Sequence, residues 1–271
     1  MSRLVGVAMS VYKSDRADFL RLALDSILDQ VNVRLNLYLH IDGEVDNLIL
    51  SLLGEYEARS NVRIYRHDEN LGLATRLNES IEQAISDEVD FIARMDADDI
   101  SKLDRFDKQI SYLESDTSID VVGSDVVEIS EAGEELFYKS MASDHETLAL
   151  NIIKKCPFNH PSVMFRVRVF KDGFRYDNEL KNTQDYYLWV DLLSSGYLFA
   201  NINEPLLYFR VNDTFHSRRG LKKAINDCKS RFYAFSKLNN VSLSNVIHVV
   251  KLFILRLAPR PIKVLAYKLF R

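Results

Sequence analysis

The sequence predicts an α/β fold, in which a mostly parallel central sheet is flanked by helices and followed by a helical, basic C-terminal extension. Strand-like and helix-like patterns alternate through roughly the first 100 residues, which is the arrangement of βαβ units. Residues 4–11, LVGVAMSV, form an unbroken apolar run, as expected of a strand buried on both faces. Residues 92–101, IARMDADDIS, end a similar run with three aspartates, and open parallel sheets bind ligands where their strands end.

The elements of the first 100 residues follow from hydrophobic periodicity. Apolar side chains recur at helical spacing in some segments and alternate, or run unbroken, in others. The predicted elements are helices over 17–30, 45–58 and 73–86, and strands over 4–11, 34–41, 62–66 and 89–95. The first strand–helix junction, SVYKSDRADF, has no glycine-rich turn, which argues against a dinucleotide-binding domain.

The second half mixes strands and helices without strict alternation. Ser101 is placed to cap a helix in which Leu103, Phe106, Ile110 and Leu113 share one face. The later predicted strands are 119–130, ELFYK, 162–167, LFANI and LLYFRV, and the later helices are 145–155, 184–196 and about 218–238. Gly196 is expected to end the second of these helices, because glycine tolerates the left-handed conformation found at helix C-termini.

Composition and charge exclude some classes of protein. A hydrophobic content of 47% with 27% charged residues is typical of a soluble globular enzyme and argues against disorder. The formal net charge of −4 gives no general attraction to nucleic acid, so no nucleic-acid partner is expected. After Asp227 the chain contains no acidic residue and nine basic ones, so the extension is basic and the preceding part is acidic.

Cysteine usage and hydropathy indicate a cytoplasmic protein. Cys156 and Cys228 are too few and too far apart for a disulfide framework, so both are expected to be reduced thiols. No uncharged apolar run reaches about 18 residues, so no transmembrane helix is expected. The short run near the N-terminus fits a strand better than a signal peptide.

The aspartate cluster is the strongest chemical signal. Asp96, Asp98 and Asp99 raise the cost of ionising one another, so they need a cation, a helix terminus or open water. Mg²⁺ or Mn²⁺ suits carboxylates together with phosphate oxygens. The alternative is that Asp98 and Asp99 only favour the N-terminus of the next helix. Residues 10–12 and Asp42 also follow strands, so all these groups are expected at one sheet edge.

The stretch IARMDADDISKLDRFDKQ (92–109) resembles family 2 glycosyltransferases of the GT-A fold, and other segments match in order. These are MSVYKSD, LDSILDQ, IDG, NLGLATRLNESI, CPFNHPSVMFR, QDYYLWVDLLSSG and NINEPLLYFRV. The resemblance covers roughly residues 3–215 and is nearest to bacterial enzymes of capsule, exopolysaccharide and O-antigen synthesis. It implies a GT-A domain over 1–217, with a Rossmann-like nucleotide-sugar-binding half (1–100) and an acceptor-binding half (101–217), before the extension at 218–271.

The resemblance also implies which residues bind a UDP-sugar. Ser10 and Tyr12 would contact the nucleoside, Asp42 would accept the imide N–H of uracil, and Arg76 would reach the base or the diphosphate. Asp96 and Asp98 would hold the donor through the metal, with Asp99 as a further ligand. The alternatives remain open: Tyr12 as a strand-end aromatic, Asp42 as a turn residue, and Arg76 as a solvated helix residue.

Asp185 matches the family's general base, which takes the proton of the attacking acceptor hydroxyl. Gln184 stands where the family usually has Glu, and the lost charge would leave the pKa of Asp185 lower. His160 and Trp189 match or neighbour positions near the sugars, although a structural histidine and a core tryptophan are the alternatives. Arg210, His216, Ser217 and Arg218 are a weaker suggestion for closure over the diphosphate.

The predicted function is metal-dependent, inverting transfer of a hexose, galactose or glucose, from a UDP-sugar to a lipid-diphosphate-linked saccharide, forming a β-linkage. The residues after 244 interleave apolar and basic side chains around Pro259 and Pro261, which suggests binding to the inner face of the cytoplasmic membrane. Packing on protein is the alternative. Other classes left open are a sugar nucleotidyltransferase, an aspartate-dependent phosphatase, and a non-catalytic glycan- or membrane-binding relative.

Overall fold

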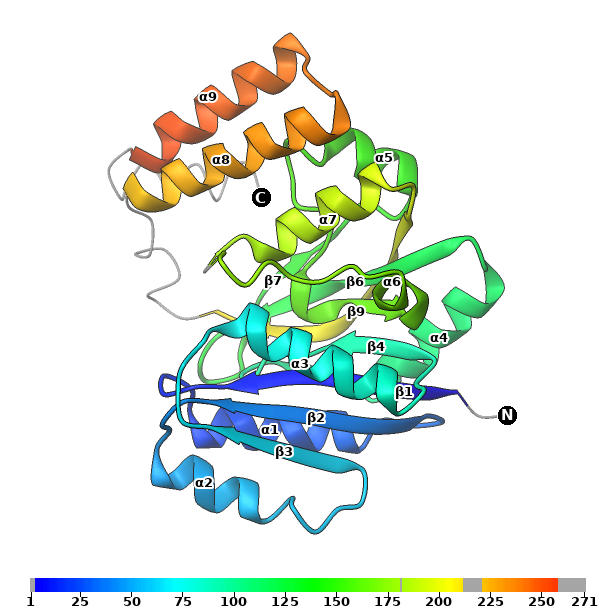
Figure 1. Cartoon of the computed structure of the whole chain (residues 1–271), viewed down its shortest axis with the longest axis vertical. Coiled ribbons are helices and arrows are strands. Elements are labelled where there is room, and N and C mark those ends of the chain that lie inside the picture. Colours follow the sequence, from blue (N-terminus) through cyan, green and yellow to red (C-terminus); the bar gives the residue numbers. More distant parts are fainter. Residues whose placement is uncertain (1–2, 181, 212–220, 258–271) are drawn as a thin grey trace.

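A mixed sheet of nine strands lies at the centre of the computed structural model, which describes residues 3–180, 182–211 and 221–257 (Figure 1). The strand order is β3-β2-β1-β4-β8-β6-β9-β5, and β7 pairs with β6 beside this path. The strands are β1 Leu4–Val11, β2 Arg34–Asp42, β3 Val62–His67, β4 Phe91–Arg94, β5 Ile100–Ser101, β6 Ile119–Ile129, β7 Glu135–Lys139, β8 Met164–Arg166 and β9 Leu198–Arg210. The predicted α/β fold with helices on both faces of the sheet is therefore confirmed.

The first half of the sheet is parallel. β1 pairs with β2 and β4, and β2 pairs with β3, all in the same direction. The side chains of β1 are almost all buried, as its apolar sequence predicts for a central strand. Because these strands are parallel, the residues that follow Val11, Asp42 and Arg94 meet at one edge of the sheet.

β9 corrects one expectation from the sequence. The segments LFANI and LLYFRV were expected to be two strands, but they form one strand of 13 residues that runs parallel to β6. The register between β9 and β6 shifts around Ser124 and Asp125, where Ile202 pairs with Ser124 and Pro205 with Asp125. Extra residues in one strand are the mark of a bulge, so the polar stretch between the two apolar segments bends the strand without ending it.

The helices cover the two faces of the sheet, with α1, α2 and α4 packed on one face and α3, α6, α7 and α8 on the other. Their bounds are α1 Ala17–Leu28, α2 Asn47–Gly54, α3 Leu73–Ser86, α4 Arg105–Ser115, α5 His145–Asn151, α6 Val167–Lys171, α7 Gln184–Ser194, α8 Leu221–Leu238 and α9 Leu243–Leu257, with a short 3₁₀ helix, η1, at His160–Ser162. The predicted cap at Gly196 is confirmed by its φ of 85° after α7.

The predicted cap at Ser101 is wrong, because α4 begins at Arg105 and is preceded by Asp104. Ser101 instead pairs with Leu207 in the sheet, and its N–H donates to the hydroxyl of Ser26. Leu103, which was expected on the buried helix face, lies before the helix and is 55% exposed. The other three residues of that face are buried as predicted.

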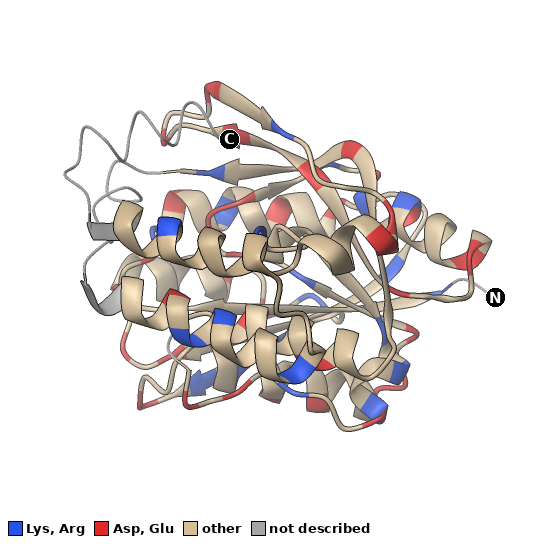
Figure 2. Ribbon diagram, turned by 90° about the horizontal axis from the view of Figure 1, so that it is seen from above, with Lys and Arg blue, Asp and Glu red and all other residues tan. Residues whose placement is uncertain are grey.

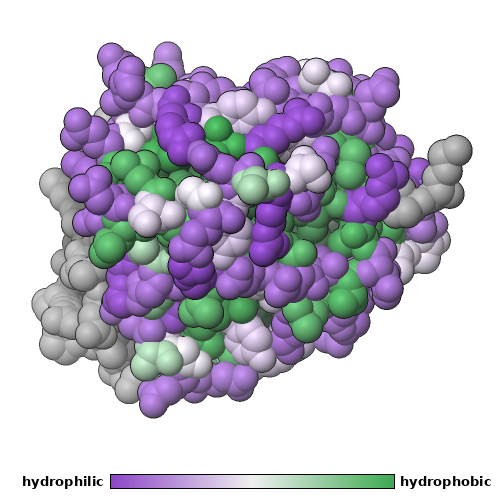
Figure 3. Space-filling model, turned by 90° about the horizontal axis from the view of Figure 1, so that it is seen from below, coloured by the Kyte–Doolittle hydropathy of each residue, from purple (hydrophilic) through white to green (hydrophobic). Residues whose placement is uncertain are grey.

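The C-terminal helices pack on the rest of the chain: α8 lies along α7, and α9 lies along α8 (Figure 1). Seen from above, their charged residues are mostly Lys and Arg (Figure 2). The opposite face of the molecule, seen from below, carries both hydrophilic and hydrophobic side chains (Figure 3). Over the described residues no helix is long and apolar enough to cross a membrane. His216, Ser217, Arg218, Pro259 and Pro261 lie outside the described residues.

Candidate active site

A cavity of about 820 Å³ opens at the carboxyl ends of β1, β2 and β4. The loop before α3, the residues before α7 and the start of that helix, one side of α8, and Cys156 and His160 also line it. Most of the residues predicted from the sequence to form a site reach it, namely Ser10, Tyr12, Asp42, Asp96, Asp98, His160, Gln184 and Asp185. Arg76, Asp99 and Trp189 do not line it. The parallel sheet has thus gathered groups from distant parts of the sequence at one edge, as expected.

Asp42 is held at the cavity wall by groups that bind both of its carboxylate oxygens. Oδ1 accepts from Arg76 Nε (2.7 Å) and from the Leu71 N–H (2.9 Å), and Oδ2 accepts from the Gly72 N–H (2.9 Å). Gly72 has a φ of 94°, a conformation that glycine adopts readily, and this lets the loop turn toward the carboxylate. Oδ2 keeps room for a further donor, because a carboxylate oxygen can accept two hydrogen bonds.

Arg76 lies behind the cavity wall and not in the cavity. Its guanidinium is 2% exposed and is shared among Asp42, both oxygens of Glu79 and the carbonyl of Glu69. These partners direct the guanidinium toward protein groups, so Arg76 positions Asp42 and the loop before α3. The alternative from the sequence, that Arg76 is a solvated helix residue, is therefore wrong.

Asp96, Asp98 and Asp99 offer carboxylate oxygens that lie within 4.8 Å of one another. Burial, and then the charge of Asp96, raises the pKa of Asp98 to about 6. Asp99 is fully buried, and burial together with the other two aspartates raises its pKa strongly. Its Oδ1 accepts from the Arg210 N–H (2.8 Å), whereas Oδ2 has no hydrogen-bond partner among the described residues.

This donor set fits a divalent cation. Three carboxylates lie close together and one of their oxygens is buried without a partner among the described residues, and hard cations prefer such oxygen ligands. The helix-terminus alternative loses support because α4 begins six residues after Asp99, beyond the first turn over which a helix dipole acts. Arg210 does not line the cavity, and its Nε donates to the Asp98 carbonyl (2.9 Å). It therefore fixes the backbone of the cluster.

Two residues of this region were missed from the sequence. Arg94 is 3% exposed, lines the cavity and forms an ion pair with Asp96, while its Nε and Nη1 have no partner within the described chain. Burial opposes its charge, but the charge and hydrogen bond of Asp96 hold its pKa above the ordinary value. Asp15 accepts from the Tyr12 N–H (2.9 Å), and burial, with the charges of Asp98 and Asp96, raises its pKa to about 7.

The signals for both residues were present in the sequence. Asp15 stands in the quoted segment MSVYKSD, and Arg94 stands two residues before Asp96. An arginine in an apolar strand directly before an acidic cluster indicates a buried ion pair, because a buried guanidinium requires a counter-charge.

Asp185 lies in the first turn of α7 and lines the same cavity as the residues at the strand ends. The helix starts after Thr183, which has a φ of 73° in the left-handed region. Gln184 is 8% exposed, and its Oε1 has no partner in the part of the chain that the structure describes. A half-buried carboxylate beside a neutral amide, both facing one cavity, is suited to accepting a proton from a bound hydroxyl.

His160 lines the cavity as a neutral imidazole. Burial, and then the charge of Arg94, lowers its pKa well below the ordinary value. Its Nε2 lies 2.9 Å from the hydroxyl of Tyr176, so the ring is held in place. The thiol of Cys156 also faces the cavity, and burial raises its pKa to about 12, so it stays protonated. Cys156 and Cys228 are both free, as predicted.

Trp189 lies in the core, which corrects the prediction that it contacts an acceptor sugar. It is fully buried and stacks on Phe165 with ring centroids 5.4 Å apart. Phe158 and Phe199 contact it edge-on. Because Trp189 is one turn after Asp185, it anchors the helix that carries this carboxylate and takes no part in the cavity surface.

The C-terminal extension contributes to the cavity through Asp227, Ser230 and Arg231 of α8. The Arg231 guanidinium carbon lies 3.9 Å from the ring centre of Tyr186, the residue after Asp185. The sequence predicts these residues only as part of the C-terminal extension and not of the site, because nothing in their spacing shows which side of α8 packs against α7.

Comparison with known proteins shows which family the chain resembles. The model of glycosyl transferase family 2 matches residues 7–174. The amylovoran biosynthesis glycosyltransferase AmsE of Erwinia amylovora is 29% identical over 267 residues, which cover 97% of both chains. An Escherichia coli UDP-Gal:alpha-D-GlcNAc-diphosphoundecaprenol beta-1,3-galactosyltransferase is 27% identical over 265 residues, which cover 97% of this chain and 94% of that protein.

The solved structure of S. aureus TarS 1–349 in complex with UDP superposes on this chain with a TM-score of 0.64. The match covers 97% of this chain and 83% of TarS 1–349 at 18% identity. A likeness at this identity concerns the fold, and it confirms the GT-A fold that was predicted from the sequence.

Proposed function

Because the chain belongs to glycosyl transferase family 2, we propose that it transfers a hexose from a UDP-sugar to a lipid-linked saccharide, with inversion, in the synthesis of a bacterial surface polysaccharide. The observation that carries this proposal is the meeting of Asp42, of Asp96 and Asp98 from the aspartate cluster, and of Asp185 in one cavity. These groups supply the three requirements of the reaction: recognition of the nucleotide, neutralisation of its diphosphate and removal of the acceptor proton.

Asp42 supports a uridine donor. Its free acceptor position on Oδ2 matches the single imide N–H of uracil, while its other positions are filled by Arg76 and backbone N–H groups. Ser10 and the partly exposed ring of Tyr12 line the same wall, where they can contact the ribose and the base. UDP is present in the TarS structure named above, and a UDP-galactose-dependent enzyme is among the relatives.

Asp96, Asp98 and Asp99 would hold a divalent cation, Mn²⁺ or Mg²⁺. When bound, such a cation neutralises the diphosphate and favours its departure. The chain's own contribution is to fix these carboxylates: Arg210 holds Asp99 and the Asp98 carbonyl, and Arg94 holds Asp96. Arg94 keeps two nitrogens, Nε and Nη1, without a partner in the described part of the chain, and their N–H groups can donate to the donor sugar or its phosphate.

Asp185 acts as the general base. Its carboxylate takes the proton of an acceptor hydroxyl, whose oxygen attacks the anomeric carbon as the bond from that carbon to the UDP oxygen breaks. The electron pair of the broken bond leaves with UDP, and attack from the opposite face converts an α-linked donor into a β-linked product. Gln184 and His160 lie beside this path and can orient the acceptor through neutral hydrogen bonds.

The alternatives from the sequence are less favoured. The matching family is one of glycosyl transferases and not of nucleotidyltransferases or phosphatases. A purely binding relative has no need for a further carboxylate, Asp185, in the same cavity as Asp96 and Asp98.

Peripheral binding to the cytoplasmic membrane is the second part of the proposal. Val246, Ile247, Val250 and Ile254 of α9 are each at least 40% exposed, and Lys251 lies among them. An exposed apolar stripe next to basic residues matches an anionic lipid surface, where a lipid-diphosphate acceptor would also be found.

Thermal-shift measurements with UDP and GDP, each with and without Mn²⁺, test the donor assignment. UDP with Mn²⁺ should raise the melting temperature, and GDP or either nucleotide without metal should raise it much less. Equal stabilisation by UDP and GDP, or UDP binding that ignores Mn²⁺, would overturn the assignment.

A further inference from the structure

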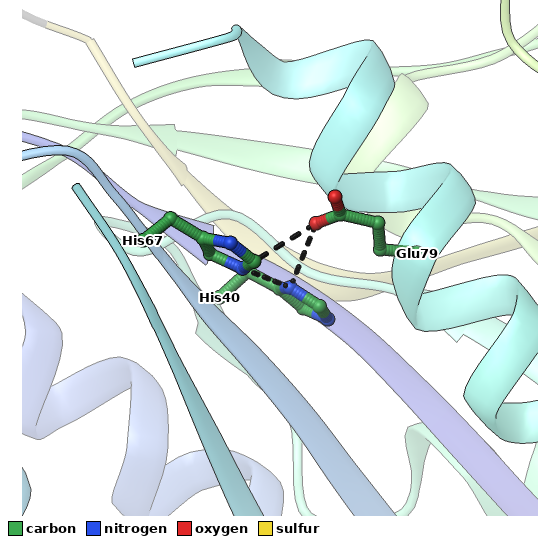
Figure 4. A group of neighbouring side chains, drawn as sticks. All are labelled: His40, His67 and Glu79. Atoms are coloured by element: carbon green, nitrogen blue, oxygen red, sulfur yellow. Dashed lines mark hydrogen bonds and ion pairs between the residues drawn. The ribbon is translucent and has the colours of Figure 1, made fainter. Parts of the chain in front are cut away.

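Two further groups of ionisable side chains in the described chain differ in how well their members satisfy one another. In the first, His40 Nδ1 and His67 Nε2 lie 2.9 Å apart, as in a ring-to-ring hydrogen bond. Glu79, which faces the two rings in Figure 4, is already paired with Arg76 at 2.9 Å. Each of these side chains therefore has a partner inside the protein, and the group calls for no ligand.

The second group, which we call the basic group, consists of Arg231 on α8, His248 and Lys251 on α9, and Lys154, which follows α5. The helices α8 and α9 pack on each other, so residues far apart in the sequence meet here (Figure 1). Burial lowers the pKa of His248, and the charges of the other three members lower it further. Positive charges that act on the same ring also repel one another, so a negative partner stabilises the group.

The described residues do not balance the charge of the basic group. Lys237, also on α8, pairs with Asp191 at 3.3 Å, whereas no cation of the basic group is in an ion pair with another described residue. Asp227, one turn before Arg231 on α8, offers one negative charge against three positive ones. Two buried nitrogens, Arg231 Nε and His248 Nε2, have no hydrogen-bond partner within the described chain. Because buried polar atoms are normally hydrogen-bonded, these nitrogens and the unbalanced charge together indicate an anion-binding site.

The basic group adjoins the proposed general base. Arg231 lines the cavity, and its guanidinium carbon lies 3.9 Å from the ring centre of Tyr186, the residue after Asp185. The charges of Asp185 and Arg231 both act on the Cys156 thiol, which burial keeps protonated, so a molecule that reaches Asp185 also comes close to Arg231. At the other end of the group, Lys251 lies among the exposed apolar residues of α9. The group therefore connects the cavity to the surface of α9.

We propose that the basic group binds the phosphate of a lipid-linked acceptor while the sugar of that acceptor lies against Asp185. This inference rests on the proposed function and adds to it the place where the acceptor's anion binds. The planar N–H groups of Arg231 match phosphate oxygens, and the two lysines add charge without fixing a direction. Because Arg231 lies over the residue next to Asp185, an acceptor whose phosphate is attached to the attacked sugar itself fits this site better than one with a long saccharide between them.

The first test measures binding without sugar transfer. Decyl diphosphate, which carries the anion and an alkyl chain but no sugar, is titrated into the full chain in EDTA, so that no metal recruits it to the aspartate cluster. Arg231→Gln should weaken binding at least about 10-fold, because a hydrogen bond to a charged group is lost. Arg231→Lys should restore part of the affinity, since the charge returns without the planar N–H groups. Lys154→Gln, at an exposed position where misfolding is not expected, should weaken binding by a smaller factor.

The matched control is Lys229→Gln, which removes one positive charge from an exposed position of α8 and should leave the affinity for decyl diphosphate unchanged. The proposal is overturned if Arg231→Gln and Lys229→Gln bind decyl diphosphate equally well. It is also overturned if Arg231→Gln reduces sedimentation with anionic vesicles but keeps its affinity for decyl diphosphate, which would assign the group to lipid headgroups.

Kinetics then test the same group during transfer. The acceptors are one sugar linked to decyl diphosphate and the decyl glycoside of that sugar, which has no phosphate. Arg231→Gln should raise the KM of the first acceptor at least about 10-fold and leave the KM of the second unchanged. An equal rise for both acceptors would contradict a phosphate contact. If the wild type transfers no sugar yet loses decyl diphosphate binding on Arg231→Gln, the anion site stands and the proposed function fails.

Discussion

Replacing Arg76 with methionine separates two roles for this arginine: positioning Asp42, or direct contact with the donor. The substitution keeps much of the buried volume but removes the partner of an Asp42 carboxylate that is 3% exposed. Removing one member of a buried ion pair costs about 3–5 kcal/mol, because the other charge stays desolvated. For a chain of this size, 1 kcal/mol corresponds to about 2–4 °C in melting temperature, so the expected loss is about 6–20 °C.

The matched control is Arg63→Met. Arg63 also pairs with an aspartate, Asp87, at 2.7 Å, but the side chain of Arg63 is 43% exposed. An exposed pair is worth about 0.2–1 kcal/mol, which predicts a shift of only a few degrees. Thermal and urea unfolding of both variants give the stabilities, and calorimetric titration with UDP and Mn²⁺ gives the donor affinity. If Arg76→Met melts like Arg63→Met yet loses UDP affinity, Arg76 contacts the donor and the structural reasoning is wrong.

Three further predictions concern the base, the metal and the membrane. Asp185→Asn should lower the transfer rate by about 10²- to 10⁴-fold while UDP binding stays the same; an unchanged rate in a radiolabelled transfer assay would remove Asp185 from the mechanism. Burial and the charge of Asp96 raise the pKa of Asp98 to about 6, so in metal-free protein Asp98 gains a proton below that pH. Mn²⁺ must displace this proton and that of Asp99, whose pKa is also raised, so its affinity should fall by at least about tenfold per pH unit below pH 6; Asp98→Asn should bind Mn²⁺ weakly and show a shallower slope. Val250→Ser with Ile254→Ser on α9, which removes apolar surface without adding charge, should reduce sedimentation with anionic vesicles without changing soluble-acceptor kinetics, and unchanged sedimentation would place the lipid contact elsewhere.

Helices and strands could be predicted from the sequence wherever one hydrophobic period, that of a helix or that of a strand, dominated a segment. β1 and β2 and the helices α1 and α3 lie close to their predicted ranges, because an unbroken apolar run or a helical stripe has few alternative ways to be buried. β9 was split in error, since the polar residues between its apolar segments look like a turn when the partner strand β6 is unknown. The Ser101 cap failed for a similar reason: pairing with β9 competes with helix capping at this residue.

The sequence predicted those site residues whose positions are determined by the ends of the parallel strands. Asp42, Asp96 and Asp98 reach one cavity because each follows a strand of the same parallel set. Whether a particular side chain faces the cavity depends on packing that sequence spacing does not contain. Trp189 illustrates this, since its position one turn after Asp185 is compatible with both the cavity and the core, and the aromatic rings around it decide for the core.

The contacts of α8 connect the reaction to the membrane proposal. One side of α8 reaches the cavity next to Asp185, with Arg231 over Tyr186, while α9, which packs on α8, presents its apolar residues to solvent. Under the proposed function, an acceptor held by its lipid in the membrane would bring its sugar end to Asp185 and leave its diphosphate nearer the bilayer. Arg231 is the basic residue of α8 at this wall of the cavity, and its Nε has no partner in the described structure. Within the proposed function, we therefore infer that α8 lies on the acceptor side of the cavity, with Arg231 placed to meet an acceptor phosphate.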